Sequence, residues 1–291
     1  MNQRVSVLLS ALPYIREFHK KTFVIKFGGS AMVDESLRES FALDVALMSL
    51  VGIKPVIVHG GGPQISEALE RFGIKSSFVG GLRKTDSQTI KVVKMVLCGQ
   101  INKEIVSAIN AQGAKAVGLS GIDASLIKAR ALNKEAYFGS LNMQVPSEEL
   151  GFVGEVESVN TKLLETLLNE CFVPVIAPIG IGACGEVYNI NADMVASAIA
   201  ISLKAHKLIY LTDSNGVKDE NSNTISSLDA FGAKTLIEKG QIRGGMLPKL
   251  HSALEALNSG VKKVHIIDGR IKHSILLEVF TSEGIGTEVL P

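Results

Sequence analysis

Thr22-Phe23-Val24-Ile25-Lys26-Phe27-Gly28-Gly29-Ser30 places a short apolar run directly before a pair of glycines. The apolar and β-branched residues of this run predict a buried strand that ends at the glycines. Residues 34–51 then carry apolar side chains at helical spacing, and residues 54–58 return to a buried-strand pattern. Strands that alternate with helices are typical of an α/β fold with a mainly parallel sheet.

The second strand ends in a similar turn, His59-Gly60-Gly61-Gly62-Pro63, which opens a predicted helix over residues 63–72. Glycines at a helix start expose backbone N–H groups, and the helix dipole adds positive potential there. One such turn by itself is explained by tight chain reversal. Two turns on consecutive parallel strands lie at the same edge of the sheet, where α/β proteins bind ligands, and they predict an anion site.

The alternation continues along the rest of the chain. Residues 120–160 are rich in turns and predict a lid rather than another strand–helix–strand unit. No linker-like segment separates the two halves, so we expect both to contribute to one continuous sheet. The remaining predicted elements are a hairpin at 78–83, helices at 86–112, 192–204 and 247–258, and strands at 114–119, 172–177, 207–211 and 263–267.

Composition favours a globular protein that acts on a small molecule. The 291 residues are 46% hydrophobic, which allows a substantial core. Lys plus Arg number 30 against 29 Asp plus Glu, so no net field recruits nucleic acid or a membrane surface. Three scattered cysteines favour a reducing cytoplasm. Residues 5–12 resemble a short signal-peptide core but continue as an amphipathic segment, and no apolar run reaches the roughly 20 residues that span a bilayer.

Two lysines stand beside glycine turns. Lys26 ends the first strand, and Lys249 closes the segment Gly244-Gly245-Met246-Leu247-Pro248-Lys249. Taken alone, a lysine at the end of a strand is more often solvated, and a surface lysine is also the simpler explanation for Lys249. A charge-assisted hydrogen bond to a phosphate is worth about 1.5 to 3 kcal/mol, which favours a binding role next to an anion site. His59 is a candidate base, but we favour a packed histidine and assign it no catalytic role.

The segment Asn189-Ile190-Asn191-Ala192-Asp193 opens a predicted helix with more polar groups than a helix cap needs. Capping by Asn191 is the simpler explanation for one of them. Asn189 is a candidate substrate ligand, and Asp193 is a candidate for orienting the lysines. The chain contains no G-x-x-x-x-G-K-[ST] motif, and Gly180 to Gly185 leads into a hairpin-like arm, which disfavours P-loop and Rossmann sites.

In combination these segments resemble the amino acid kinase family, and within it the branch that phosphorylates the γ-carboxylate of N-acetyl-L-glutamate in arginine synthesis. The resemblance implies an open αβα sandwich in one continuous domain, with N-acetyl-L-glutamate bound by residues 22–179 and ATP by residues 180–291. The segments that carry it are Lys26 to Gly29, His59 to Pro63, Gly81 to Asp86, Gly118 to Gly121, Phe152 to Val156, Asn189 to Asp193, and Lys249.

The resemblance also assigns roles to particular residues. Lys26 and Lys249 would flank the transferring phosphoryl group, and Asp193 would hold both lysines. Arg83 would pair with the substrate α-carboxylate, to which its two-pronged donor geometry is suited. The remaining substrate ligands would be Gly61, Gly62 and Asn189, and the ATP side would be formed by Gly28, Gly29, Thr212 and Asp213.

The chemistry fits that inventory. A glutamate side chain with a pKa of about 4.3 is already an anionic nucleophile at neutral pH, so no general base is required. Catalysis then depends on bringing two anions together, which lysines, backbone N–H groups and Mg²⁺ carried by ATP would favour. The sequence contains no dedicated metal cage, which suits a magnesium ion bound mainly by the phosphates.

Both ends of the chain resemble the arginine-inhibited members of the family. Residues 1–21, with Ala11 to Arg16, resemble the helix that interlocks dimers into a hexamer, a trimer of dimers, although a helix that merely covers the core is the simpler reading. Near the end, Glu278, Glu283, Gly284 and Thr287 resemble the arginine-binding segment, which implies feedback inhibition. One departure is Thr212-Asp213-Ser214-Asn215-Gly216, where the family usually has T-D-V-P-G.

Several alternatives share the fold: carbamate kinase, aspartokinase, uridylate kinase and acetylaminoadipate kinase. Arg83 together with Asn189 favours an acylated amino acid over carbamate or a nucleotide. A longer acidic side chain differs by one methylene, worth only about 1 to 3 kcal/mol. A different class is a non-catalytic arginine-sensing or partner-binding module, which would need neither the lysine pair nor Asp193.

Overall fold

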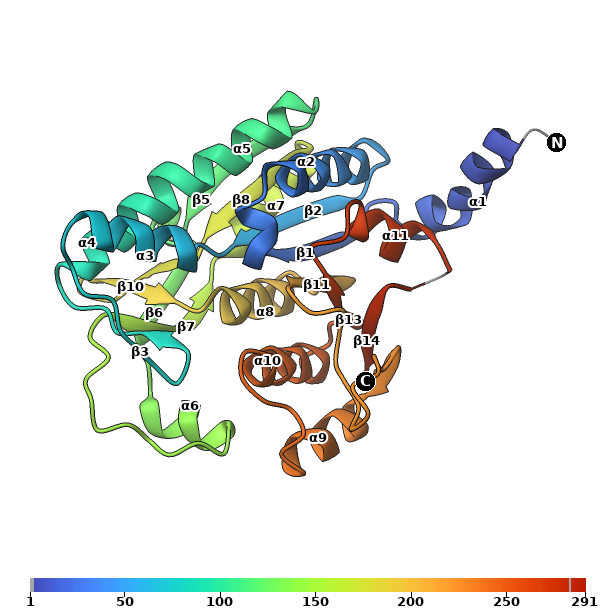
Figure 1. The fold of residues 1–291 in the computed structure, drawn as a ribbon. Helices are drawn as coiled ribbons and strands as arrows, with labels where there is room; N and C mark the ends of the chain where they lie inside the picture. Colours follow the sequence, from blue (N-terminus) through green and yellow to red (C-terminus); the bar gives the residue numbers. More distant parts are fainter. Residues whose placement is uncertain (1–2, 283) are drawn as a thin grey trace.

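A central sheet of eight strands organises the molecule (Figure 1). The computed structural model describes residues 3–282 and 284–291, and the side chains of residues 9–282 and 284–291. The strands of the sheet are β1 (Thr22–Phe27), β2 (Lys54–His59), β5 (Lys115–Ser120), β8 (Phe172–Ala177), β11 (Lys207–Thr212), β12 (Ser227–Asp229), β13 (Lys263–Asp268) and β14 (Gly286–Leu290). Their order is β12-β14-β13-β11-β1-β2-β8-β5, and of the neighbouring pairs only β13 with β14 is antiparallel.

The predicted strands are confirmed, and so is the continuous sheet. β1 and β8 have the predicted bounds, and the four other predicted strands differ by a residue or less at each end. The agreement follows from burial, since β1, β2, β8 and β13 each have five buried residues after a half-buried first one. β1 from the first half pairs with β11 from the second, which places the end of β1 at the centre of the carboxyl edge.

Helices cover both faces of the sheet and enclose one apolar cluster on each side (Figure 1). The fold is therefore the predicted α/β sandwich with three layers. One layer contains α2 (Glu35–Leu50), α3 (Gly62–Arg71), α4 (Thr89–Lys94), η2 (Met95–Ile101), α5 (Asn102–Ala111) and α11 (Ser274–Phe280). The other contains α7 (Thr161–Asn169), α8 (Ala192–Ser202), α9 (Ala230–Glu238) and α10 (Met246–Asn258).

The helix predicted at residues 86–112 is continuous from Thr89 to Ala111 but changes type in the middle. Asp86 caps it, since its Oδ1 accepts hydrogen bonds from the N–H groups of Gln88 (3.1 Å) and Thr89 (2.8 Å). Between α4 and α5, η2 is a π-helix of seven residues. Such widened turns are rare and occur frequently at functional sites. Periodicity alone did not reveal it.

The turn-rich region predicted as a lid contains the short helix α6 (Lys134–Ser140) between antiparallel strands, and no parallel strand–helix–strand unit. Its strands close into a small sheet with the hairpin that follows β8. That hairpin spans the G-x-G-x-x-G match, which confirms that no Rossmann turn is present there. The members of the small sheet are β6 (Ile127–Ala131), β7 (Val153–Val159), β9 (Ile179–Ile181) and β10 (Val187–Ile190).

Four further short elements lie in the first half of the chain. The predicted hairpin at 78–83 is confirmed as β3 (Phe78–Val79) paired with β4 (Leu82–Arg83). Two 3-10 turns follow strand ends, namely η1 (Gly29–Met32) after β1 and η3 (Asp123–Ser125) after β5.

The first helix, α1 (Gln3–Phe18), projects away from the body of the molecule (Figure 1). Its end is anchored, because Phe18 is buried, packs edge-on against Phe23 and lies under the ammonium group of Lys207 at 4.7 Å. Leu9 and Leu12 are 50% and 37% exposed. The helix therefore does not lie over the core along its length. Among the described residues, no helix combines the length and apolarity that crossing a membrane requires.

Candidate active site

Three predicted catalytic residues meet at the carboxyl edge of the sheet. Lys26 comes from the end of β1, Asp193 from the first turn of α8 and Lys249 from the first turn of α10. The Nζ atom of Lys26 lies 3.1 Å from Asp193 Oδ1, and that of Lys249 lies 2.6 Å from Asp193 Oδ2. One carboxylate therefore holds two ammonium groups, each through its own oxygen.

Burial makes this arrangement electrostatically strong. Asp193 and Lys26 are only 5% and 9% exposed. Burial alone would raise the pKa of Asp193, but Lys26 and Lys249 outweigh it and lower that pKa to about 2. Burial lowers the pKa of Lys26, and Lys249 lowers it further, while Asp193 opposes both. The site thus carries two cations against one anion, and the excess positive charge suits a phosphoryl group.

A cavity of about 280 Å³ opens from the catalytic residues, and all four predicted substrate ligands line it. Gly61 and Gly62 border it from the start of α3, and Arg83 from β4. Asn189 borders it from β10. The lysine pair and Asp193 form its inner end, so the structure brings these seven predicted residues together. The apolar part of the lining includes Ile65, Phe78, Leu82, Leu97 and Val153.

Arg83 is buried without an acidic partner. Its NH2 group donates to the carbonyl oxygen of Gly62 (2.8 Å) and to Ser66 Oγ (2.9 Å), and its NH1 group donates to Ser76 Oγ. The guanidinium also stacks over the Phe78 ring at 4.5 Å. Burial lowers its pKa. An uncompensated cation at a cavity wall is suited to a carboxylate ligand.

Asn189 is linked to the Arg83 segment through Thr85. Its side-chain amide donates to Thr85 Oγ1 (3.3 Å), and its backbone N–H donates to the carbonyl oxygen of Phe152 (2.9 Å). Thr85 is fully buried and in turn donates to the Arg83 carbonyl oxygen (2.7 Å). Thr85, Ser66 and Ser76 were not predicted as site residues, because nothing in local sequence distinguishes a serine or threonine that supports a ligand from one that faces solvent.

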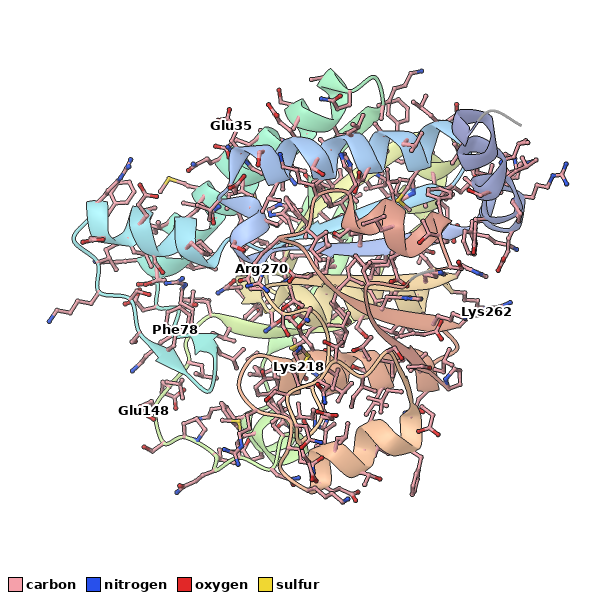
Figure 2. The ribbon with its side chains drawn as sticks, turned by 45° about the vertical axis from the view of Figure 1, so that its right-hand side comes forward. Glu35, Phe78, Glu148, Lys218, Lys262 and Arg270 are labelled. Atoms are coloured by element: carbon pink, nitrogen blue, oxygen red, sulfur yellow. The ribbon has the colours of Figure 1, made fainter. Side chains whose placement is uncertain are left out.

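A second cavity of about 410 Å³ lies beside the first and shares Lys249 with it. Thr212 and Asp213, predicted for the ATP side, line it together with Ser214 from the loop that departs from the family pattern. Lys218 also lines this second cavity, whereas Phe78 lines the first; both residues are labelled in Figure 2. Lys249 therefore stands between a cavity lined by Arg83 and a cavity lined by Asp213.

The glycine pair after β1, predicted for the ATP side, lies against Lys26 and Asp213, and neither glycine is among the lining residues of the two cavities. Asp213 Oδ1 accepts hydrogen bonds from the N–H of Ser30 (2.8 Å) and from its hydroxyl (2.7 Å). Gly29 has a φ of +73°, and a Cβ there would come within 2.5 Å of Asp213 Oδ1. A Cβ on Gly28 would lie 2.5 Å from Lys26 Nζ. The positive φ favours glycine at residue 29, and a Cβ at residue 28 would displace the ammonium group of Lys26.

Acidic groups near the cavities are already engaged. Both oxygens of Asp193 bind ammonium groups, and Asp213 Oδ1 binds Ser30. Within the described part of the chain, no group of three or more His, Cys, Asp or Glu residues is arranged to hold a metal ion. This donor set suits a magnesium ion held mainly by nucleotide phosphates and does not suit a protein cage.

The residues predicted to bind arginine lie apart from both cavities. Glu278 on α11 is half-buried, with its side chain 8% exposed; it contacts His265 Nδ1 on β13 at 2.6 Å and accepts a hydrogen bond from the N–H of Ile285 at 3.0 Å. Burial opposes ionisation of Glu278, but His265 and the Ile285 N–H lower its pKa overall. Gly284 lies beside the Glu278 carboxylate. Glu283 is outside the described residues.

Comparison with known proteins agrees with this geometry. Residues 21–268 match the amino acid kinase family. The chain belongs to that family. It is 63% identical over 290 residues to the acetylglutamate kinase of Aquifex aeolicus, covering 99% of this chain and 97% of the relative. It is 51% identical over 293 residues to the acetylglutamate kinase of Persephonella marina, covering 99% and 98%. This amino acid kinase is thus a phosphotransferase of the acetylglutamate kinase type.

Solved structures share the fold. The N-acetylglutamate synthase of Neisseria gonorrhoeae, complexed with coenzyme A and N-acetyl-glutamate, matches with a TM-score of 0.85 at 25% identity. That match covers 99% of this chain but 63% of the synthase chain. Carbamate kinase from Giardia lamblia bound to AMP-PNP matches with a TM-score of 0.64 at 17% identity, covering 93% and 98%. The latter match shows the fold alone.

Proposed function

We propose that this chain transfers the γ-phosphoryl group of ATP to the γ-carboxylate of N-acetyl-L-glutamate, a step of arginine biosynthesis in the cytoplasm. One observation carries the proposal: two lysines share one buried carboxylate at the wall of the first cavity, and one of them, Lys249, also borders the second cavity. The amino acid kinase match and the acetylglutamate kinase relatives support the same reaction.

The acceptor would occupy the cavity lined by Arg83 and Asn189. Arg83 is buried and has no acidic partner, so it would pair with the α-carboxylate. Asn189 would hold the acetylated end, and the N–H groups of Gly61 and Gly62 would face the γ-carboxylate. ATP would occupy the neighbouring cavity, near Thr212, Asp213 and the turn at Gly28 and Gly29. Residues 22–179 and 180–291 would accordingly serve as acceptor-binding and ATP-binding lobes of one domain.

Charge neutralisation would drive the chemistry. The acceptor carboxylate is already ionised at neutral pH and needs no base. Lys26 and Lys249 would stand on either side of the transferring group, and Asp193 would keep both ammonium groups in place while the negative charge redistributes. Mg²⁺ carried by ATP would neutralise part of the phosphate charge. Preorganised cations cost no rearrangement during the reaction, which is why a rigid buried carboxylate between them is useful.

A hydroxamate assay tests this proposal. The protein is incubated with ATP, Mg²⁺, hydroxylamine and one acceptor, and an acyl phosphate is trapped as its hydroxamate. We expect product with N-acetyl-L-glutamate and much less with free glutamate or acetylaminoadipate. No product from any of the three acceptors would rule out the carboxylate kinase function. Preference for acetylaminoadipate would keep the chemistry and change the substrate.

A non-catalytic arginine-sensing module is the second candidate. It is favoured by the similarity to N-acetylglutamate synthase structures, since one of these structures is complexed with L-arginine. Such a module has no use for two lysines sharing a buried aspartate. The hydroxamate assay separates the two candidates, since a sensing module binds arginine and forms no product.

We further propose that arginine inhibits the enzyme and that the assembly is a hexamer built as a trimer of dimers. The projecting helix α1, with Leu9 and Leu12 exposed, supports an intermolecular role. Glu278 beside Gly284 offers a carboxylate with little solvent exposure for a guanidinium ligand. Isothermal titration with arginine and sedimentation analysis of the intact protein test these two proposals separately.

A further inference from the structure

His59 is buried directly behind the acceptor cavity, at the end of β2. We propose that His59 is a positioning residue whose neutral imidazole fixes the Gly60 carbonyl and thereby aims the backbone N–H groups of Gly61 and Gly62 at the acceptor carboxylate. The inference rests on the proposed function, because it assigns those N–H groups to that ligand.

The contacts of the imidazole define its protonation. Nδ1 lies 2.8 Å from the carbonyl oxygen of Gly60, which can only accept, so Nδ1 carries the proton. Nε2 lies 3.3 Å from the amide nitrogen of Asn102, which can only donate, so Nε2 is an acceptor. A second proton on Nε2 would point at that amide. Burial likewise lowers the pKa of His59, to about 4, so the ring stays neutral at physiological pH.

Gly60 is held from both sides of its backbone. Its N–H donates to the carbonyl oxygen of Phe27 at the end of β1 (2.8 Å), and its carbonyl accepts from His59. The first helical hydrogen bond of α3 runs from Ile65 N–H to Gly61 O (2.9 Å). The N–H groups of Gly61 and Gly62 precede it and belong to the free N–H groups of a helix start. Fixing Gly60 therefore fixes the direction of the two groups that follow.

Asn102 links this turn to the rest of the sheet. It is 1% exposed, and its amide also donates to Val175 O on β8 (2.9 Å) and to Leu119 O on β5 (3.3 Å). It stands at the junction of the π-helix η2 with α5, and the π segment packs directly on the turn. A Cβ on Gly61 would lie 2.5 Å from Ile101 Cδ1 and 2.7 Å from Leu97 Cδ2. The turn is thus supported from behind, with its free side toward the cavity.

Two substitutions separate the two hydrogen bonds of the ring. His59→Asn keeps a donor at the Nδ1 position, and Asn102 retains its two carbonyl acceptors. His59→Gln keeps an acceptor near the Nε2 position and loses the donor to Gly60. We expect His59→Gln to raise the KM for N-acetyl-L-glutamate about tenfold or more, with the KM for ATP within about twofold of wild type. For His59→Asn, we expect the KM for each substrate to stay within about threefold of the wild-type value.

A purely structural role of His59 gives a different pattern. Partial unfolding lowers the active fraction, and hence kcat, without changing either KM. Equal KM values for the Gln variant and wild type, or a larger defect in the Asn variant, would overturn the inference. An inactive wild-type protein would instead overturn the proposed function itself, so the two failures are distinguishable.

A measurement on the unmodified protein covers the case in which a variant fails to fold. With ¹⁵N-labelled histidine, the Nδ1 and Nε2 resonances of the six imidazoles report their tautomers. We expect one ring that remains a neutral Nδ1–H tautomer from pH 8 down to pH 5 and whose Nε2 shift moves little with pH. If no ring shows this behaviour, the hydrogen bond to Gly60 is absent and the inference is wrong.

Discussion

Lys249 borders both cavities, and its ammonium group lies 2.6 Å from Asp193 Oδ2. In the proposed reaction, a cation in that position would contact the transferring phosphoryl group from both the nucleotide side and the acceptor side. Lys26 approaches the same carboxylate through its other oxygen at 3.1 Å. At the scale of single residues, the proposed reaction would therefore depend on where these two positive charges are held, because it needs neither a general acid nor a general base from the protein.

Lys249→Ala removes one of these charges. We expect kcat to fall by about a hundredfold or more, as for the loss of other transition-state donors. Steady-state kinetics with saturating ATP and acceptor measure this. Lys234→Ala, on the exposed side of α9, is the matched control and should behave as wild type. An unchanged kcat for Lys249→Ala would remove this lysine from the reaction.

At the scale of elements, Gly118 on β5 leaves room for Asn102. A Cβ at residue 118 would lie 1.9 Å from Asn102 Oδ1, and Asn102 is buried, so it cannot swing away. Gly118→Ala should therefore displace Asn102, raise the acceptor KM and lower the unfolding free energy by about 1 to 3 kcal/mol. Gly139→Ala has open space at its Cβ and serves as control. Wild-type KM and Tm in Gly118→Ala would show that β5 does not support the glycine turn.

A second pair of elements is joined by a buried carboxylate. Asp44 on α2 is 1% exposed and contacts His273 Nδ1, just before α11, at 2.6 Å. Burial raises the pKa of Asp44 from 3.8 to about 6, against the opposing effect of His273. Because the folded-state pKa lies above the unfolded one, the contribution to stability is complete below about pH 4. It is lost as the pH rises through about 6.

Asp44→Asn removes this titration. Relative to wild type, we expect the variant to gain up to about 3 kcal/mol of unfolding free energy between pH 4 and pH 7, the amount that corresponds to the shift. Urea unfolding at several pH values measures the difference. Glu35→Gln, on the same helix and exposed (Figure 2), should show no such gain. A pH-independent difference between Asp44→Asn and wild type would contradict the expected titration.

Some helices and strands could be predicted from the sequence, and others could not. β1 was predictable to the residue because an apolar run between Lys21 and Gly28 is buried on both faces. The π-helix η2 was not, since one widened turn scarcely alters helical periodicity. The short elements α9, α11 and β12 were also missed, because each packs mainly through long-range contacts that local spacing does not encode.

Some residues of the candidate site could likewise be predicted from the sequence, and others could not. Glycine turns and the cation at Lys26 were recognisable locally, because strand-to-helix junctions have a known chemistry. The polar residues at the start of α8 suggested that Asp193 orients the lysines, and the family resemblance supported the joining of Lys26, Asp193 and Lys249, which three separate elements supply. The serine partners of Arg83 and the link from Ser30 to Asp213 carried no sequence signal. The family resemblance thus identified the candidate ligand residues, whereas the residues that support them were found only in the structure.

At the scale of the whole molecule, α1 projects from the body, and only its end is anchored. Removing residues 1–12 deletes Leu9 and Leu12 but keeps Phe18, whose ring packs on Phe23 and under Lys207. We expect this truncation to reduce the assembly size and to weaken arginine inhibition, with kcat retained. Sedimentation and inhibition curves check it. If the truncated protein showed wild-type assembly size and wild-type arginine inhibition, α1 would have no role in assembly or regulation.

A design consequence follows from Lys249 standing between the two cavities. Both cavities include Lys249 in their lining, so a molecule that occupied both would have to pass this one lysine. An acylated amino acid joined to a nucleotide by a phosphate-length tether would place both of its ends in preformed pockets. Tethering makes the second contact intramolecular, which raises affinity well beyond that of either half. Such a bisubstrate compound would be a selective probe for this enzyme.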